Sequence, residues 1–242
     1  MTQLKVLFVA TSNDRIGDSI YQTGAWLEEI AAPYYIFKDA NATVTIASPK
    51  GGEVPMDPRS LSIMVATSYT KRFLKDESAM QFAAHSKPLA EINAADFDIV
   101  YVPGGHGPLW DLADNKILKS LLETYNRLHK PVGLVCHGVA ALLSLQNDSG
   151  EPLVKGKRVT GFSNSEEKSG SYAELVPFLL ETELTLLGGL YSRNENYVSY
   201  VVADGNIITG QNSASSEAVA KKLLMVLEDR KYGITLEPVN NN

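Results

Sequence analysis

Short apolar runs alternate along this chain with longer segments in which apolar residues recur at helical spacing. The runs are rich in Val, Ile and Leu, a composition typical of strands buried on both faces of a parallel sheet. The sequence predicts such strands at residues 5–10, 43–47, 99–102 and 132–135. Between the last two, residues 116–129 place Ile117, Leu118, Leu121, Leu122, Tyr125 and Leu128 on one helical face, which indicates a crossover helix.

Parallel strands joined by helices predict the fold class. A crossover helix returns the chain to the starting edge of the sheet, so successive strands lie near each other with helices on both faces. We therefore expect an α/β protein, a three-layer sandwich with a mostly parallel sheet between helices. Residues 1–242 contain no linker, repeat or low-complexity tract, which indicates a single domain.

The remaining segments complete this outline. A helix is expected from about Thr23, with Pro33 kinking or restarting it and Asn41 ending it. Residues 60–90 are expected to form a helical insertion, in which a helix at 68–85 turns Phe73, Leu74, Met80 and Phe82 inward. Further expectations are a strand at 154–162, a helix at 172–187, a hairpin of 197–202 and 207–209, a helix at 215–227 and a polar tail at 228–242.

Charge and composition exclude several classes of protein. With a formal net charge of −6 and no cluster of Lys and Arg, the chain is not expected to bind nucleic acid or an anionic membrane. Its single cysteine excludes an internal disulfide, and its first residues form a strand rather than a signal peptide. We therefore expect a cytoplasmic protein whose partner is a small molecule.

The only cysteine directly follows the predicted strand at 132–135. Gly138 permits a tight turn after Cys136 and His137, and Val139 begins an apolar segment that can open a helix. A helix N-terminus beneath the thiol favours the thiolate, and a strand-to-helix corner resembles the nucleophile elbow of hydrolases. Cys136 is therefore a candidate nucleophile. The alternative is a buried structural cysteine, since free Cys is among the most buried residue types.

A glycine-rich loop follows the neighbouring strand at 99–102. Its residues are Pro103-Gly-Gly-His-Gly-Pro108, and it opens on the same edge of the sheet as Cys136. The amides of Gly105 and His137 can together hold a developing oxyanion. His106 is a candidate either for contact with a substrate or for a hydrogen bond that fixes the loop.

The histidines do not indicate a metal site. His85, His106, His129 and His137 show no HExxH or paired-ligand spacing. A lone cysteine cannot make a thiolate zinc site. We therefore expect no catalytic metal.

Six motifs, taken together and in order, resemble the ThiJ/PfpI superfamily, which has the flavodoxin-like fold of the class I glutamine amidotransferases. Within it, the chain resembles the branch of glyoxalase III enzymes and heat-shock chaperones. The motifs are Thr23-Gly-Ala-Trp-Leu-Glu-Glu29, Ala47-Ser-Pro-Lys-Gly-Gly52 with Asp57-Pro58, the loop 103–108, Cys136-His-Gly138, Gly161-Phe-Ser-Asn-Ser-Glu-Glu167 and Gly210-Gln-Asn212. The amidotransferases carry glycine where this chain has Leu134, which argues against glutamine hydrolysis.

The resemblance implies catalytic roles for four residues: Cys136 as the nucleophile, His137 as the neighbouring base, Glu29 as an acid, and Glu167 as the acid that orients the histidine. Two of these assignments rest on register alone. Helical periodicity does not decide whether Glu28 or Glu29 points inward, and no periodicity separates Glu166 from Glu167 in their loop.

The implied activity is that of a cofactor-free, glutathione-independent glyoxalase, a lyase (D-lactate dehydratase) that converts methylglyoxal to D-lactate through a cysteine hemithioacetal. Its substrate would be a small reactive aldehyde, and relatives suggest a homodimer. The alternative is a stress-related holdase chaperone or a protein deglycase of the same superfamily, which would bind unfolded or glycated proteins. A cysteine peptidase or amidase is the weaker alternative, because the expected pocket is small.

Overall fold

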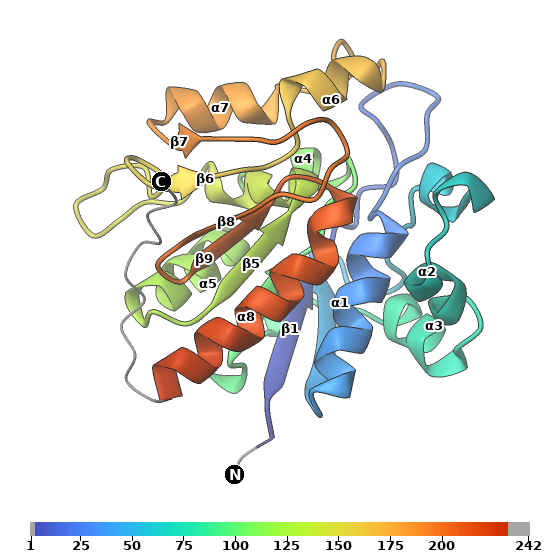
Figure 1. Cartoon of the computed structure of the whole chain (residues 1–242), viewed down its shortest axis with the longest axis horizontal. Coiled ribbons are helices and arrows are strands. Elements are labelled where there is room, and N and C mark those ends of the chain that lie inside the picture. Colours follow the sequence, from blue (N-terminus) through green and yellow to red (C-terminus); the bar gives the residue numbers. More distant parts are fainter. Residues whose placement is uncertain (1–2, 232–242) are drawn as a thin grey trace.

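A seven-stranded sheet forms the centre of the molecule (Figure 1). The computed structural model describes residues 3–231. The strands lie in the order β3-β2-β1-β4-β5-β9-β8, and every neighbouring pair is parallel except β8 and β9. Their bounds are β1 Lys5–Val9, β2 Thr43–Ser48, β3 Lys87–Pro88, β4 Ile99–Val102, β5 Val132–Val135, β8 Val201–Asp204 and β9 Ile207–Gly210. The mostly parallel sheet predicted from the sequence is confirmed.

Alternate side chains of the central strands pack into two separate cores. Val6 and Phe8 of β1 belong to one core, and Leu7 and Val9 belong to the other, because successive side chains of a strand point to opposite faces. The first core lies beneath α1 (Leu27–Asp39) and α8 (Ser216–Lys231); the second lies beneath α4 (Pro108–Asp111), α5 (Lys116–Arg127) and α7 (Leu180–Leu186). Figure 1 shows α1 and α8 side by side on one face and α5 behind the sheet, which confirms the three-layer sandwich.

The first helix begins later than expected and is continuous. The sequence predicted a start near Thr23, but residues 23–26 are held in place by backbone hydrogen bonds to residues 55–57 and to the glycine-rich loop. Pro33 lies inside α1, where it is buried, and the helix continues through it instead of restarting. Asn41 follows the helix with a φ of 57°, the left-handed conformation expected for it.

The insertion contains two short helices rather than the one expected at 68–85. α2 (Ser68–Phe73) ends at Leu74, and α3 (Glu77–Ala84) begins again after Asp76, whose carboxylate accepts hydrogen bonds from the first amides of α3. The break changes which side chains face inward. Leu74 and Met80 are exposed, contrary to expectation, whereas Phe73 is buried.

Several elements after β5 are shorter than expected. The strand predicted at 154–162 is reduced to β6 (Arg158–Val159), which pairs with β7 (Leu190–Tyr191) outside the main sheet. After α6 (Asn164–Ser169), the helix predicted at 172–187 is replaced by turns up to α7, because Pro177 disfavours helical backbone at the residue before it. α8 includes residues 228–231 of the predicted tail, and residues 232–242 lie outside the described part.

Short 3₁₀ segments connect these elements. They are η1 Pro58–Leu61, η2 Ile63–Val65, η3 Leu89–Glu91, η4 Ala94–Asp96, η5 Cys136–Leu142 and η6 Ser213–Ser215. Within residues 3–231, every helix is too short or too polar to cross a lipid bilayer.

Candidate active site

The glycine-rich loop and the cysteine turn meet at the carboxyl ends of β4 and β5. The two turns interlock closely: a Cβ atom added at Gly104 would lie 2.7 Å from the backbone nitrogen of His137, and one added at Gly138 would lie 2.5 Å from the carbonyl oxygen of Val102. Side chains essentially never approach backbone this closely, so only glycine fits at both positions. The loop and the turn therefore form one rigid unit at this edge of the sheet.

Cys136 occupies a strained corner. Its φ is 58°, a left-handed conformation that is uncommon for residues other than Gly, Asn and Asp. Such strain clusters at functional sites, as expected for a nucleophile elbow. The following segment differs from the expectation, however, because η5 is a seven-residue 3₁₀ helix rather than an α-helix. A 3₁₀ helix has poorer hydrogen-bond geometry, so the predicted helix dipole beneath the thiol is weakened.

The surroundings of Cys136 favour the neutral thiol in the free protein. Burial raises the pKa of Cys136 well above its ordinary value, and Glu29, once ionised, acts in the same direction. The backbone amides of Gly105 and His137 face the sulfur and partly oppose this rise. The sequence predicted a thiolate at this position, and the structure corrects that prediction: the thiol needs a base to remove its proton.

Glu29 lies beside Cys136, in the first turn of α1. It is completely buried, and its Oε2 accepts a hydrogen bond of 2.6 Å from the amide of Gly104. Its Oε1 is also buried and has no hydrogen-bond partner among the described residues. Burial raises the pKa of Glu29 to about 8, although the hydrogen bonds of Gly104 and of the Cys136 thiol lower it. At neutral pH the group is therefore mainly a carboxylic acid.

Glu28 points elsewhere. Its Oε2 accepts a hydrogen bond of 2.5 Å from the hydroxyl of Thr67, the N-cap residue of α2, and it lies near Glu217 of α8. Burial raises the pKa of Glu28 to about 7. Helical periodicity did not decide which of the two acids points inward. In the structure, Glu29 contacts the cysteine and Glu28 does not.

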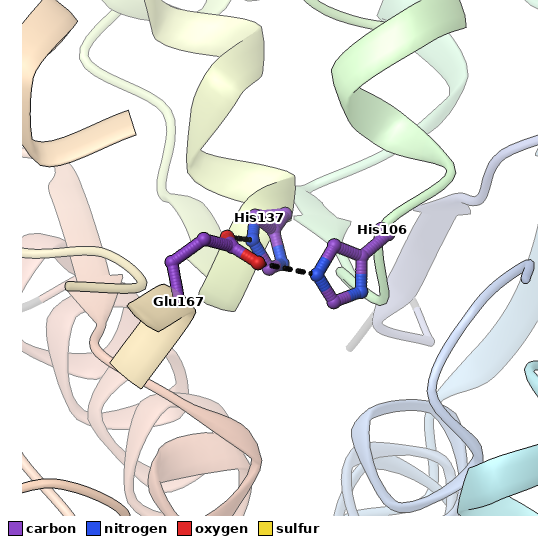
Figure 2. A group of neighbouring side chains, drawn as sticks. All are labelled: His106, His137 and Glu167. Carbon is purple, nitrogen blue, oxygen red and sulfur yellow. Dashed lines mark hydrogen bonds and ion pairs between the residues drawn. The ribbon is translucent and has the colours of Figure 1, made fainter. Parts of the chain in front are cut away.

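A second carboxyl group, Glu167, is hydrogen-bonded to two histidines, His106 and His137 (Figure 2). His137 is hydrogen-bonded through Nδ1 to the cysteine Sγ at 3.5 Å and through Nε2 to Glu167 Oε2 at 2.5 Å. His106 Nε2 is hydrogen-bonded to Glu167 Oε1 at 2.7 Å. Burial alone would raise the pKa of Glu167, but the two histidines hold it well below its ordinary range. Glu167 is therefore ionised.

Glu166 points away from the histidines. It is fully buried, and its carboxylate accepts hydrogen bonds from Ser163, Gln211, Asn212 and the amide of Tyr197. These partners come from three separate segments, so Glu166 links three parts of the wall of the cavity. The structure places Glu167, rather than Glu166, against His137, in the register chosen from the sequence.

Arg59 belongs to this site, and sequence reasoning did not identify it. Its guanidinium is paired with Asp57, its NH2 group lies 3.0 Å from His106 Nδ1, and it stacks over the ring of Tyr172 at 4.2 Å. Arg59 directly follows the motif Asp57-Pro58, but a charged residue in a turn has no periodicity that would assign it to a pocket. The only signal was an Arg two residues after an Asp in a segment of the family motif.

One cluster has the atom types of a metal site. Within the described residues, His106, His137 and Glu167 form the one such group, with ligand atoms within 4.8 Å of one another. A guanidinium can only donate, so Arg59 makes His106 Nδ1 an acceptor and places the single proton of the neutral ring on Nε2, the atom that a metal would need. We therefore interpret the cluster as a hydrogen-bond network.

These groups surround a cavity of about 360 Å³. Cys136, Glu29 and the Glu167 network line it, and Trp26, Phe162, Tyr172 and Tyr197 supply aromatic walls. The site thus combines a nucleophile, a protonated acid, a histidine with an ionised partner and two amides in a largely apolar cavity. Such a combination suits proton transfer on a small carbonyl compound.

Comparison with known proteins gives relatives that match most of the chain. A Schizosaccharomyces pombe protein named probable glutathione-independent glyoxalase hsp3103 is 29% identical over 237 residues, covering 85% of this chain and 90% of its own. The structure of Francisella tularensis rapid encystment protein REP24 superimposes with a TM-score of 0.89 at 37% identity, covering 93% of this chain and 99% of that one. Glyoxalase III from Candida albicans superimposes with a TM-score of 0.80 at 26% identity, covering 92% and 97%.

A family model gives the same result as the individual relatives. The DJ-1/PfpI family model matches residues 20–225, which is most of the chain and includes every residue of the candidate site. The resemblance to the ThiJ/PfpI superfamily inferred from the sequence motifs is confirmed. The chain belongs to the DJ-1/PfpI family.

Proposed function

We propose that this protein is a glutathione-independent glyoxalase that converts methylglyoxal to D-lactate through a hemithioacetal on Cys136. The observation that carries the proposal is that the Cys136 thiol contacts Glu29 directly and Glu167 through His137, two carboxyl groups whose pKa values are shifted in opposite directions. A glyoxalase must move a proton between adjacent carbons, which requires an acid and a base on either side of the bound substrate. The names of the relatives from S. pombe and C. albicans support the same activity.

In the first step, Cys136 Sγ attacks the aldehyde carbon. His137 Nδ1, 3.5 Å from the sulfur, takes the thiol proton, and Glu167 stabilises the imidazolium through the bond to Nε2. The amides of Gly105 and His137, which face the sulfur in the free site, would hold the oxyanion that forms beside it. The proton then passes from His137 to this oxygen and completes the hemithioacetal.

In the second step, the proton on the aldehyde carbon moves to the neighbouring carbon. His137 removes it while neutral Glu29 protonates the ketone oxygen, which gives an enediol. His137 then protonates the second carbon, and Glu29 recovers its proton from the hydroxyl of the first. The product is a lactoyl thioester: the first carbon has been oxidised and the second reduced, so no external redox partner is needed. Water hydrolyses the thioester, and its C–S bond breaks to release lactate and the thiol.

The proposal is tested with methylglyoxal in buffer free of glutathione and treated with a chelator. D-lactate should accumulate with the wild-type protein and stop when Cys136 is replaced by Ala or fully alkylated, since no second thiol exists in the chain. Glu28→Gln serves as a control for loss of a neighbouring charge and should retain turnover. Undiminished D-lactate formation by Cys136→Ala would exclude the cysteine mechanism.

A second candidate function, a holdase chaperone, is favoured by exposed apolar side chains. Ile20 is 88% exposed and Met64 is 87% exposed. Ile20 lines a shallow cavity together with Pro58 and Arg59, so this surface adjoins the active-site cavity. Unfolded clients, or a second copy of the chain in a homodimer, would cover such residues.

An assay of aggregation suppression distinguishes holdase activity from enzymatic activity. A holdase that works through its surface should lose suppression on Ile20→Ser with Met64→Ser and keep it on Cys136→Ala. Equal suppression by all variants would show that these residues are not the client surface. Sedimentation of the double variant tests whether the same residues hold a dimer together.

A further inference from the structure

Two neighbours, Asp57 and Tyr172, hold the guanidinium of Arg59 in position. Its Nε donates to Asp57 Oδ1 at 2.8 Å, and its NH2 group is paired with Asp57 Oδ2. Asp57 is completely buried and also accepts a hydrogen bond of 2.9 Å from the Thr23 hydroxyl. The face of the guanidinium packs on Tyr172. With the orientation of the guanidinium set from two sides, the NH2 group, which pairs with Asp57, also lies 3.0 Å from His106 Nδ1 and can donate its second N–H there.

This contact determines the charge of His106. A guanidinium has N–H donors and no acceptor, so Nδ1 of the histidine must use its lone pair. A proton on Nδ1 would face the Arg59 N–H group directly and is excluded by that contact. His106 is therefore neutral, with its one proton on Nε2, and it donates this proton to Glu167 Oε1.

The charge of His106 matters because Glu167 is shared. The two imidazole rings lie with their centroids 4.2 Å apart, and both bond to the same carboxylate. If His106 became an imidazolium, it would neutralise Glu167 and repel a second positive charge on His137. His137 would then be a weaker base toward the Cys136 thiol.

We propose that Arg59 is a positioning residue that keeps His106 neutral and so reserves the negative charge of Glu167 for His137. This role rests on the proposed glyoxalase function, in which His137 takes up a proton from the thiol. Arg59 acts through His106 and Glu167 and does not itself touch the reacting atoms.

The other groups around His106 agree with this role. Within residues 3–231, Glu167 from α6 is its one anionic contact. His137 follows β5, Arg59 comes from η1, and the Tyr172 ring lies 5.1 Å from the His106 ring. Burial, the neighbouring His137 and Arg59 lower the pKa of His106, and Glu167 raises it; the pKa is about 4. Removing Arg59 leaves the carboxylate as the nearest charge, so the pKa of His106 should rise.

The first experiment measures the charge of His106 directly and needs no substrate. The ¹⁵N shifts of the His106 ring are followed across pH in wild type, Arg59→Met and Arg59→Lys. We expect the wild-type ring to stay neutral with the proton on Nε2, and the Met variant to protonate about two pH units higher. Arg15→Met is the control, because Arg15 lines the neighbouring cavity with Arg59 but is not hydrogen-bonded to His106.

The second experiment is a double-mutant cycle with His106→Gln. A glutamine amide can donate to Glu167 in place of Nε2–H but can never become charged. In the histidine background, Arg59→Met should lower kcat about tenfold at pH 5, where most of His106 is charged, and should leave kcat within about twofold of wild type at pH 8.5, where His106 is neutral again. In the glutamine background, Arg59→Met should change kcat by less than about twofold at every pH.

The outcomes separate this proposal from a structural role. An equal loss in both backgrounds, or a loss that does not depend on pH, would show that Arg59 supports the loop or acts through its charge alone, and would overturn the proposal. Arg59→Lys retains an ion pair with the buried Asp57, so it replaces the Met variant if that variant fails to fold. If the wild type formed no D-lactate, the proposed function would fail, and the ¹⁵N measurement would still decide the charge of His106.

Discussion

Glu29 and Glu167 are the same kind of side chain, both are buried, and both are linked to Cys136, Glu29 directly and Glu167 through His137, yet their pKa values are shifted in opposite directions. Glu29 receives one backbone hydrogen bond, has one oxygen without a partner, and has a pKa of about 8. Glu167 receives hydrogen bonds from two histidines, which hold its pKa well below the ordinary range.

The difference shows that burial alone does not decide the charge of a carboxyl group. Burial acts to raise the pKa of both residues, but the hydrogen-bond partners and neighbouring charges outweigh it only at Glu167. One amide and one thiol do not compensate for the loss of water around Glu29, whereas two imidazoles do so for Glu167. One side of the thiol is therefore supplied with a proton donor and the other with a proton acceptor.

The largest effect should come from replacing the protonated acid. Glu29→Gln keeps a hydrogen-bonding group of the same size but cannot exchange a proton, so D-lactate formation should fall by about 10³-fold or more. The matched variant Glu28→Gln removes the adjacent carboxyl, which is bonded to Thr67 instead of facing the cysteine. It should keep kcat within about threefold of wild type, because it touches no reacting group.

A large loss of activity in Glu28→Gln, with normal activity in Glu29→Gln, would contradict the role assigned to Glu29. It would mean that the half-buried Glu28, and not the carboxyl beside Cys136, supplies the proton.

A smaller loss of activity is expected when Glu167 is replaced. Glu167→Gln replaces a carboxylate that accepts two hydrogen bonds by an amide that must donate one, so one histidine is forced into the wrong tautomer. We expect kcat to fall about 10²-fold with a smaller change in KM. Glu174→Gln, in the exposed loop that follows α6, is the control for loss of one negative charge.

Steady-state kinetics and ¹⁵N shifts of His137 provide the measurement. Full activity with an unchanged histidine spectrum in Glu167→Gln would leave this carboxylate without the proposed role.

The smallest predicted effect is on stability, and its sign differs between the two residues. The folded protein binds the proton of Glu29 more tightly than the unfolded chain, so Glu29 lowers stability as pH rises from about 4.5 to about 8. Relative to wild type, Glu29→Gln should therefore gain stability over this range, by a few kcal/mol at most. Glu167 has the opposite shift: its contribution is present above about pH 4.5 and is lost as pH falls below it.

Urea unfolding of wild type and both variants at pH 4, 6 and 8 tests this prediction. Parallel pH dependences for the two variants would contradict the assignment of opposite protonation states.

The sheet could be predicted from the sequence because its strands are encoded locally. The apolar runs at 99–102 and 132–135 match β4 and β5 in full, and the amphipathic segment between them forms α5. The same local signals failed where tertiary packing decides. The extended segment at 23–26 depends on a partner about thirty residues away, and the break between α2 and α3 depends on one capping side chain, Asp76.

The candidate site was predictable only in part. The motif around Cys136 marks a tight turn, and family register selected Glu29 and Glu167 from pairs of adjacent acids. Neither the protonation states nor Arg59 could be predicted, because both depend on which groups from distant segments come within hydrogen-bond distance. The thiolate was expected from a helix dipole, but the structure has a 3₁₀ segment and a buried thiol instead.

The interlocked glycines at 104 and 138 have a consequence for how relatives of this protein can diverge. The two turns cannot separate without disrupting β4 and β5. The free energy needed to arrange the nucleophile and its amides is therefore spent during folding and not in each catalytic cycle. Changes in substrate preference would then have to arise elsewhere. The segments that carry Tyr172 and Tyr197 are turns outside the sheet, and they line the same cavity. New specificities can evolve there while the reacting groups stay in place.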